Sequence, residues 1–170
     1  MIRDPSRRGR ALAEFYLTVE PRLFVDLDEA GVLPAHDDPA RAERVRNEWA
    51  CFALYACVRG LIAAGGFNRE TGAAIDALHE RAMAAWWNAG PGDGGDEWRR
   101  TMIADRYAEY GTIGQAGGAS AAATVARRLG EAAARHMAEE GPVHGALAET
   151  VGSLHETLAE GAAEAVRRAE

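Results

Sequence analysis

The feature that most constrains this fold is a stretch of helix with apolar side chains on every side. Asp38 followed by Pro39 predicts a helix start, because the carboxylate can cap free N–H groups while proline fits the first turn. A Gly-Gly pair predicts the end of this helix at about residue 64. Every residue of Trp49–Val58 is apolar, and in a soluble protein a helix that is apolar all round is surrounded by other helices. The sequence therefore predicts a central helix over about 39–64.

Arg59 is the polar residue that follows this stretch on the same helix. An unpaired guanidinium buried at that point would cost several kcal/mol. We therefore expect Arg59 either to reach the end of the bundle or to pair with a carboxylate.

The rest of the chain also has the pattern of helices. Apolar residues recur every three to four positions, and no run alternates like a strand rich in Val, Ile and Thr. Pro21 is expected to break the first helical stretch in two. The sequence therefore predicts an all-α protein, an antiparallel bundle of six or seven helices. The expected helices lie at about 6–19, 21–30, 39–64, 69–88, 96–110, 121–140 and 143–168.

One domain over 1–170 is expected, because a chain of 170 residues usually closes around a single core. The Gly- and Pro-rich segment 89–95 predicts a linker, and an alternative division therefore places aromatic-rich helices in 1–88 and the remaining helices in 96–170. The glycines of 111–118 superficially resemble an anion-binding loop. No strand precedes them and no lysine follows, so we expect a connector or lid that loosens the preceding helix.

Charge and composition exclude several classes of partner. The net charge of -7 and the pI of about 5.3 argue against nucleic acid and anionic membrane surfaces, because such binding neutralises phosphates. The most apolar stretch, Trp49–Ala64, contains Arg59 and is shorter than the roughly 18–20 residues that cross a membrane. No apolar leader follows the N-terminus, so a cytoplasmic protein is expected. All 19 basic residues are Arg and Ala is abundant, as is typical of a GC-rich bacterial genome.

The last two expected helices form an Ala-rich hairpin with no aromatic residue after Tyr110. Small side chains permit close helix approach but bury little area per residue, so the hairpin needs a further surface to pack on. That surface is either the aromatic-rich half of the same chain or the same hairpin of a second copy. The second alternative predicts a homodimer, the commonest oligomer.

A metal site is one candidate for chemistry. Asp76 and His79 are three residues apart, the spacing by which a carboxylate and an imidazole on one helix share a metal in di-iron bundles. With Glu48, which lies one turn before Phe52, they form the candidate metal set. A second pair of this kind is missing from the sequence, and no cofactor is predicted.

Two further groups were weighed for chemistry. His136, Glu140 and His144 are a weaker candidate zinc set, since three ligands without a fourth make at best an open site. Cys51 and Cys57 lie on the apolar helix, where a raised pKa makes them poor nucleophiles. The sequence also has no G-x-S-x-G motif, so nucleophilic catalysis is not predicted.

Aromatic rings and arginines are concentrated between residues 49 and 110. If helices 39–64, 69–88 and 96–110 are neighbours, these side chains line an apolar pocket with a few anion-recognising points. Ordinary core packing is the alternative for the rings. The candidate ligand-binding residues are Trp49, Tyr55, Arg59, Trp86, Arg106, Tyr107 and Tyr110.

Three functional hypotheses are open from the sequence. The first is a non-enzymatic interaction or regulatory module that acts through helical surfaces, as a homodimer or with another protein. The second is a protein that binds a small aromatic or anionic molecule in the pocket just described. The third is a metal-dependent enzyme of helical-bundle type that uses the candidate metal set.

Overall fold

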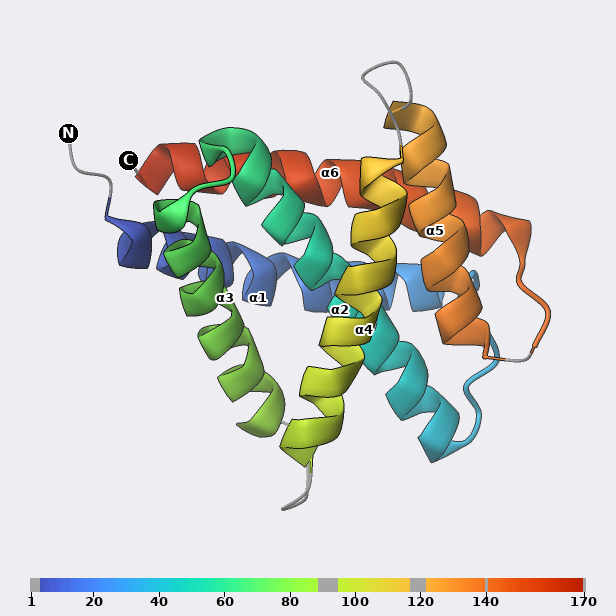
Figure 1. The fold of residues 1–170 in the computed structure, drawn as a ribbon. Helices are drawn as coiled ribbons and strands as arrows, with labels where there is room; N and C mark the ends of the chain where they lie inside the picture. The colour runs from blue at the N-terminus through green and yellow to red at the C-terminus, as the bar shows by residue number, and fades with distance from the viewer. Residues whose placement is uncertain (1–3, 89–94, 117–121, 140, 170) are drawn as a thin grey trace.

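The computed structural model describes residues 4–88, 95–116, 122–139 and 141–169. Within these ranges the chain forms six α-helices and no β-strand (Figure 1), so the predicted all-α fold is confirmed. The helices are α1 (Pro5–Glu29), α2 (Pro39–Gly65), α3 (Arg69–Asn88), α4 (Gly95–Gln115), α5 (Ala122–Ala138) and α6 (Gly145–Ala169).

α2 is the central helix of the bundle, as predicted. It contacts each of the other five helices, and every residue of Trp49–Val58 is buried. Asp38 caps it, because its Oδ1 accepts hydrogen bonds from the backbone N–H groups of Ala40 and Arg41. Gly66, with a φ of 72°, ends it. By length and composition α2 is also apolar enough to cross a membrane, but most of its apolar window is buried against the other helices, as in the core helix of a soluble protein.

The other helices are arranged around α2. α1 and α6 contact each other and run in opposite directions, and α3, α4 and α5 alternate in direction and cross them steeply (Figure 1). α1 packs against α3, and α6 packs against α5 and α2. Helices from both sides of the predicted linker therefore share one core; residues 89–94 of that linker lie outside the described ranges.

The α5–α6 hairpin packs on its own chain. α6 lies against α1 and α2, and α5 lies against α2. Leu129, Val151 and Leu158 of the hairpin belong to the same core as the aromatic residues of α2. The surface that the hairpin needs is therefore supplied within one copy, which removes the reason for which the sequence predicts a homodimer.

Small residues bring helix backbones close together in this core, and two of these contacts involve α6. Gly60 of α2 faces Ala159 of α6, and a Cβ at Gly60 would collide with the Ala159 carbonyl oxygen. Gly130 of α5 faces Ala148 and Gly152 of α6 in the same way. Such close approach increases the number of atoms in van der Waals contact, which compensates for the small side chains.

α1 continues through Pro21, so the predicted break there is wrong. Proline cannot donate a hydrogen bond to the carbonyl of Leu17, but Leu17 is exposed and water can reach it. Contacts with α2 hold the helix beside the proline. Arg46 Nη2 donates to Glu20 Oε2 at 2.8 Å, and Trp49 Nε1 donates to the Glu20 carbonyl at 3.2 Å.

α4 continues through Gly111 and Gly114, so the predicted loosening at these residues is also wrong. Gly114 lies directly beside the guanidinium of Arg59, where a Cβ would collide with it. The missing side chain therefore lets α4 pack over that arginine. Residues 117 and 118 of the predicted connector lie outside the described ranges.

Candidate functional site

Three of the candidate ligand-binding rings pack against one another in the core. The Tyr55 ring centroid lies 5.3 Å from those of both Tyr107 and Tyr110, and Tyr110 packs edge-on against Phe52 at 5.4 Å. Burial raises the pKa of Tyr107 and of Tyr110 well above the usual value, so both phenols stay neutral. These rings fill space between α2 and α4, and none lines the cavities described below.

Three other candidates also serve packing. Trp49 is fully buried, and Trp86 is half-buried against the core. Arg59 has no carboxylate partner among the described residues, in contrast to one of the two expectations. Instead it hydrogen-bonds to the phenol of Tyr55 and lies near His155. Burial raises the pKa of Tyr55, and the hydrogen bond to Arg59 opposes part of that rise.

The candidate metal set is not assembled. Glu48 is paired with Arg106, whereas His79 on α3 hydrogen-bonds to the Tyr107 hydroxyl at 3.0 Å. Burial lowers the pKa of His79, and the nearby carboxylate of Asp76 partly opposes this. In the part of the chain that the structure describes, no three His, Cys, Asp or Glu side chains form a group that could hold a metal ion. Glu140 of the alternative zinc set lies outside the described residues.

The largest of the cavities described here is a cleft of about 1060 Å³ between α2, α4 and α5. From α4 it is lined by Trp98, Met102 and Arg106, which are four residues apart and so share one face of the helix. Trp98 at 43% and Val143 at 38% exposure are two of the five exposed large apolar side chains, and both line the cleft. The cleft therefore has an accessible apolar wall.

A buried ion pair joins two walls of this cleft. Arg106 of α4 donates two hydrogen bonds to Glu48 of α2, from Nε to Oε2 at 2.8 Å and from Nη2 to Oε1 at 2.6 Å. The Glu48 side chain is 6% exposed and that of Arg106 is 23% exposed. The hydrogen bond to Glu48 raises the pKa of Arg106, so the guanidinium stays charged.

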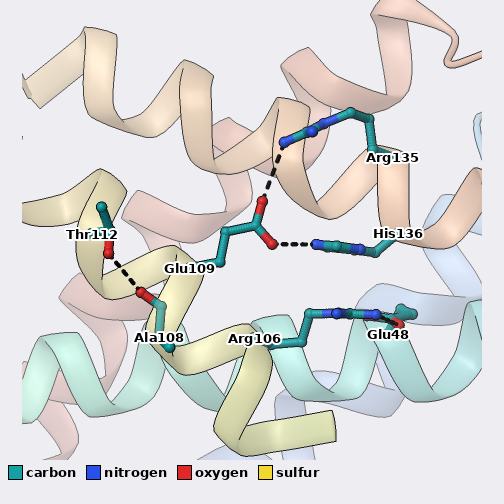
Figure 2. A network of polar contacts seen from close by, with 7 residues as sticks. All are labelled: Glu48, Arg106, Ala108, Glu109, Thr112, Arg135 and His136. Atoms are coloured by element: carbon teal, nitrogen blue, oxygen red, sulfur yellow. Dashed lines mark hydrogen bonds and ion pairs between the residues drawn. The ribbon is translucent and has the colours of Figure 1, made fainter.

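Glu109 makes a second polar link, between α4 and α5. Figure 2 shows its carboxylate between two side chains of α5: His136 Nε2 lies 2.6 Å from Oε2, and Arg135 Nη2 donates to Oε1 at 3.2 Å. The Arg106–Glu48 pair lies beside this link in the same view. The two links together hold α4 against α2 and α5 at the cleft.

A third ion pair crosses the cleft from α2 to the end of α5. Arg44 Nη1 donates to Glu139 Oε2 at 2.5 Å, and both side chains are partly exposed. The same two residues also line a neighbouring cavity of about 500 Å³. Such an exposed pair contributes only about 0–1 kcal/mol, so an incoming molecule can displace it at little cost.

A smaller cavity of about 570 Å³ lies between α3 and α4, where the sequence predicts a pocket. It is lined by His79, Met83 and Ile103 rather than by the predicted aromatic residues. The buried Glu48–Arg106 pair lines the cleft between α2, α4 and α5 instead. The cleft between α2, α4 and α5 is therefore the better candidate site.

Sequence reasoning found only part of this cleft. Arg106 was predicted as a ligand-binding residue, Glu48 as a metal ligand and His136 as a zinc ligand, but none of them as partners. Glu109 and Arg135 were missed. The i, i+3 spacing of Arg106 and Glu109 is a signal that both lie on one face of α4, but nothing local shows which helices that face meets.

Comparison of the chain with protein-family models, with curated proteins and with solved structures finds no match. No relative therefore supplies a function for the cleft. The functional argument rests on the side chains that line it and on their geometry.

Proposed function

We propose that this protein is a non-enzymatic binding module that takes a small amphipathic molecule into the cleft between α2, α4 and α5. The observation that carries the proposal is that apolar and polar side chains line the same cleft. Trp98, Met102 and Val143 supply accessible apolar surface, and Arg106 and His136 supply polar groups in the same cleft. Small-molecule sites typically combine apolar walls with a few placed polar groups in this way.

The pairing of the charged groups supports binding rather than catalysis. Both carboxylate oxygens of Glu48 are occupied by Arg106, so Glu48 is not free to accept or donate a proton. The carboxylate of Glu109 is likewise held by His136 and Arg135. Groups that are paired in this way orient a ligand and hold the walls in place.

The experiment is a fragment screen by ligand-observed NMR and thermal shift on the whole chain. Fragments that bind the cleft should lose affinity in a Trp98→Ala variant, which removes most of the apolar wall. Phe67→Ala is the matched control, because Phe67 is 88% exposed and does not line the cleft. Absence of any fragment that distinguishes the two variants would refute the proposal.

A second candidate is the interaction module, in which the same cleft receives an apolar side chain of another protein or of a second copy. The exposure of Trp98 favours it, because tryptophan is enriched in the centres of protein interfaces. Light scattering at micromolar concentration tests self-association. A mass of 18.2 kDa would exclude the homodimer.

We further propose that the protein is bacterial and cytoplasmic. An Arg-only set of basic residues and abundant Ala support the bacterial origin. Burial of α2, the longest apolar helix described, supports a soluble protein. Fractionation of a cell that expresses the natural gene would test the location.

A further inference from the structure

The free polar groups on the inner wall of the cleft include hydrogen-bond donors. Arg106 uses Nε and Nη2 for Glu48, and Nη1 has no partner among the described residues. Nη1 is not among the buried atoms without a partner, and Arg106 lines the cleft, so this nitrogen is accessible there. The side-chain amide nitrogen of Asn47 on the α2 wall also lacks a partner, but it is buried and so is not accessible to a ligand in the cleft.

His136 presents a further nitrogen. Its Nε2 is 2.6 Å from the carboxylate of Glu109, so Nε2 carries a hydrogen. Nδ1 has no partner among the described residues and is not among the buried atoms without a partner. In a neutral ring Nδ1 is then a hydrogen-bond acceptor, so it can receive a donor but cannot bind a carboxylate.

The carboxylates that line the cleft, in contrast, are occupied or lie at its rim. Both oxygens of Glu48 are taken by Arg106. The side chains of Glu43 and Glu139 are 65% and 55% exposed, and Glu139 is paired with Arg44. A ligand that enters the cleft thus meets the free guanidinium nitrogen of Arg106 on the inside, and among the described residues it finds no free buried carboxylate there.

We propose that the ligand is an organic monocarboxylate with an apolar, preferably aromatic, body. Its carboxylate accepts a hydrogen bond from Arg106 Nη1, and its body lies against Trp98 and Met102. This inference rests on the proposed function of the cleft. The carboxylate of such a ligand is an acceptor for Arg106 Nη1, and its apolar body covers the apolar wall.

Charge favours one negative charge over two. Three arginines and three glutamates line the cleft, which makes it formally neutral, and the whole chain carries -7. The N-terminus of α2, where Ala40 lines the cleft, is no phosphate site, because Asp38 already accepts its free N–H groups. Arg106 Nη1 can serve a single carboxylate, whereas a phosphate dianion would bring two negative charges into a cleft with no net positive charge.

Three probes of one shape test this inference. They are 2-naphthylacetate, the neutral 2-naphthylacetamide and the dianionic 2-naphthylmethylphosphonate, each titrated into the whole chain by calorimetry and by NMR. The acetate should bind at least about tenfold more tightly than the amide, as expected for a charge-assisted hydrogen bond. It should also bind more tightly than the phosphonate.

Two variants show whether Arg106 and His136 supply this preference. Arg106→Lys keeps a positive charge beside Glu48. A lysine has a single side-chain nitrogen, so it cannot bind both carboxylate oxygens and also present a separate nitrogen to the cleft. It should reduce the preference for acetate over amide about tenfold. His136→Gln keeps a donor for Glu109 and removes no donor from the cleft, so the fold and the preference should both persist. Arg127→Gln is the control, because Arg127 is exposed on α5 and pairs only with Glu131 among the described residues.

The outcomes separate this inference from the proposed function. Equal binding of acetate and amide, or tighter binding of the phosphonate, would overturn the monocarboxylate and leave the cleft as an apolar binding site. No binding of any probe, while the fragment screen still finds ligands that depend on Trp98, would overturn the monocarboxylate alone. A preference for acetate that Arg106→Lys retains would overturn the assignment of its carboxylate to Arg106.

Discussion

His155 should make the stability of this protein fall as the pH drops below neutrality. Its imidazole is buried in α6, with ring centroids 5.6 Å from Phe52 and 6.0 Å from Tyr55 of α2. Burial, reinforced by the positive charge of Arg59, lowers the pKa of His155 from 6.5 to about 4. The carboxylate of Glu156 lies 3.4 Å from Nδ1 but is half exposed, so solvent screens it.

The magnitude follows from the difference between the two pKa values. Between pH 6.5 and about 4 the unfolded chain takes up a proton at His155 while the folded protein does not, so the free energy of unfolding falls across that window. A factor of ten in proton affinity is about 1.4 kcal/mol, so the full loss is ~3 kcal/mol near pH 4. Above about pH 6.5 the imidazole is neutral in both states and the contribution to pH dependence vanishes.

The assay is urea unfolding followed by circular dichroism at pH 7 and pH 4, for the natural chain and for His155→Phe. The decrease in unfolding free energy between the two pH values should be ~3 kcal/mol smaller in the variant, because the other titrating groups are common to both proteins. Replacement of the exposed His144 by Gln is the control and should leave the decrease unchanged. NMR titration of the folded protein should place the imidazole transition near 4. An equal decrease in the natural chain and in His155→Phe would refute the reasoning.

Three further predictions concern packing, the buried ion pair and the thiols. Gly130→Ala should lower the free energy of unfolding by roughly 1–3 kcal/mol, because the added Cβ meets the α6 backbone. Gly72→Ala adds a Cβ that meets nothing and should raise the free energy of unfolding by up to about 1 kcal/mol. Denaturant titrations in which the two variants behave alike would contradict this. Arg106→Met should lower the free energy of unfolding by roughly 3–5 kcal/mol, because Glu48 stays buried without a partner. Adding Glu48→Leu should restore most of that free energy. Strictly additive effects in the double-mutant cycle would count against the pair. Both cysteine thiols, whose pKa burial raises, should resist a thiol reagent at pH 8 until denaturant is added, and rapid labelling of the folded chain would show that α2 is not enclosed.

Several local features were predictable because their causes lie within a few residues. Asp38 caps α2 as predicted, and Asn68 caps α3 by accepting from the backbone N–H of Thr71 at 2.9 Å. Gly31 follows the end of α1 and has a φ of 66°. The backbone N–H of Val32 donates back to the carbonyl of Leu27 at 3.3 Å. Caps depend on side chains next to the helix end, so they can be recognised without knowledge of the fold.

The errors at Pro21 and Gly114 have a tertiary cause. Both residues lower the intrinsic preference for a helix, and the sequence rule weighs only that preference. In the folded chain α1 is held beside the proline by Glu20 and α2, and Gly114 leaves room for Arg59. Packing energy gained on both sides of each residue exceeds the local penalty of about 1 kcal/mol for glycine or about 3 kcal/mol for proline.

Prediction of the candidate cleft from the sequence has the same limit. Glu48 and Arg106 are 58 residues apart, and Glu109 and His136 are 27 apart. Glu48, Arg106 and His136 were singled out from the sequence as chemically capable residues and Glu109 was not, because charge and spacing along one helix do not say which other helix a residue will meet. The tyrosines drew attention as pocket residues because aromatic side chains suit both a pocket and a core.

The sequence by itself determined that the chain is helical and that α2 lies at the centre, because hydrophobic periodicity and an apolar surface on every side are properties of one helix. Only the tertiary structure decided which helices are neighbours, and with that the place of the cleft. Those neighbours depend on where backbones can approach, as at Gly60 and Gly130, and on which side chains remain to be paired after the core is filled. Fit of this kind is a property of two surfaces together, and neither surface carries it alone.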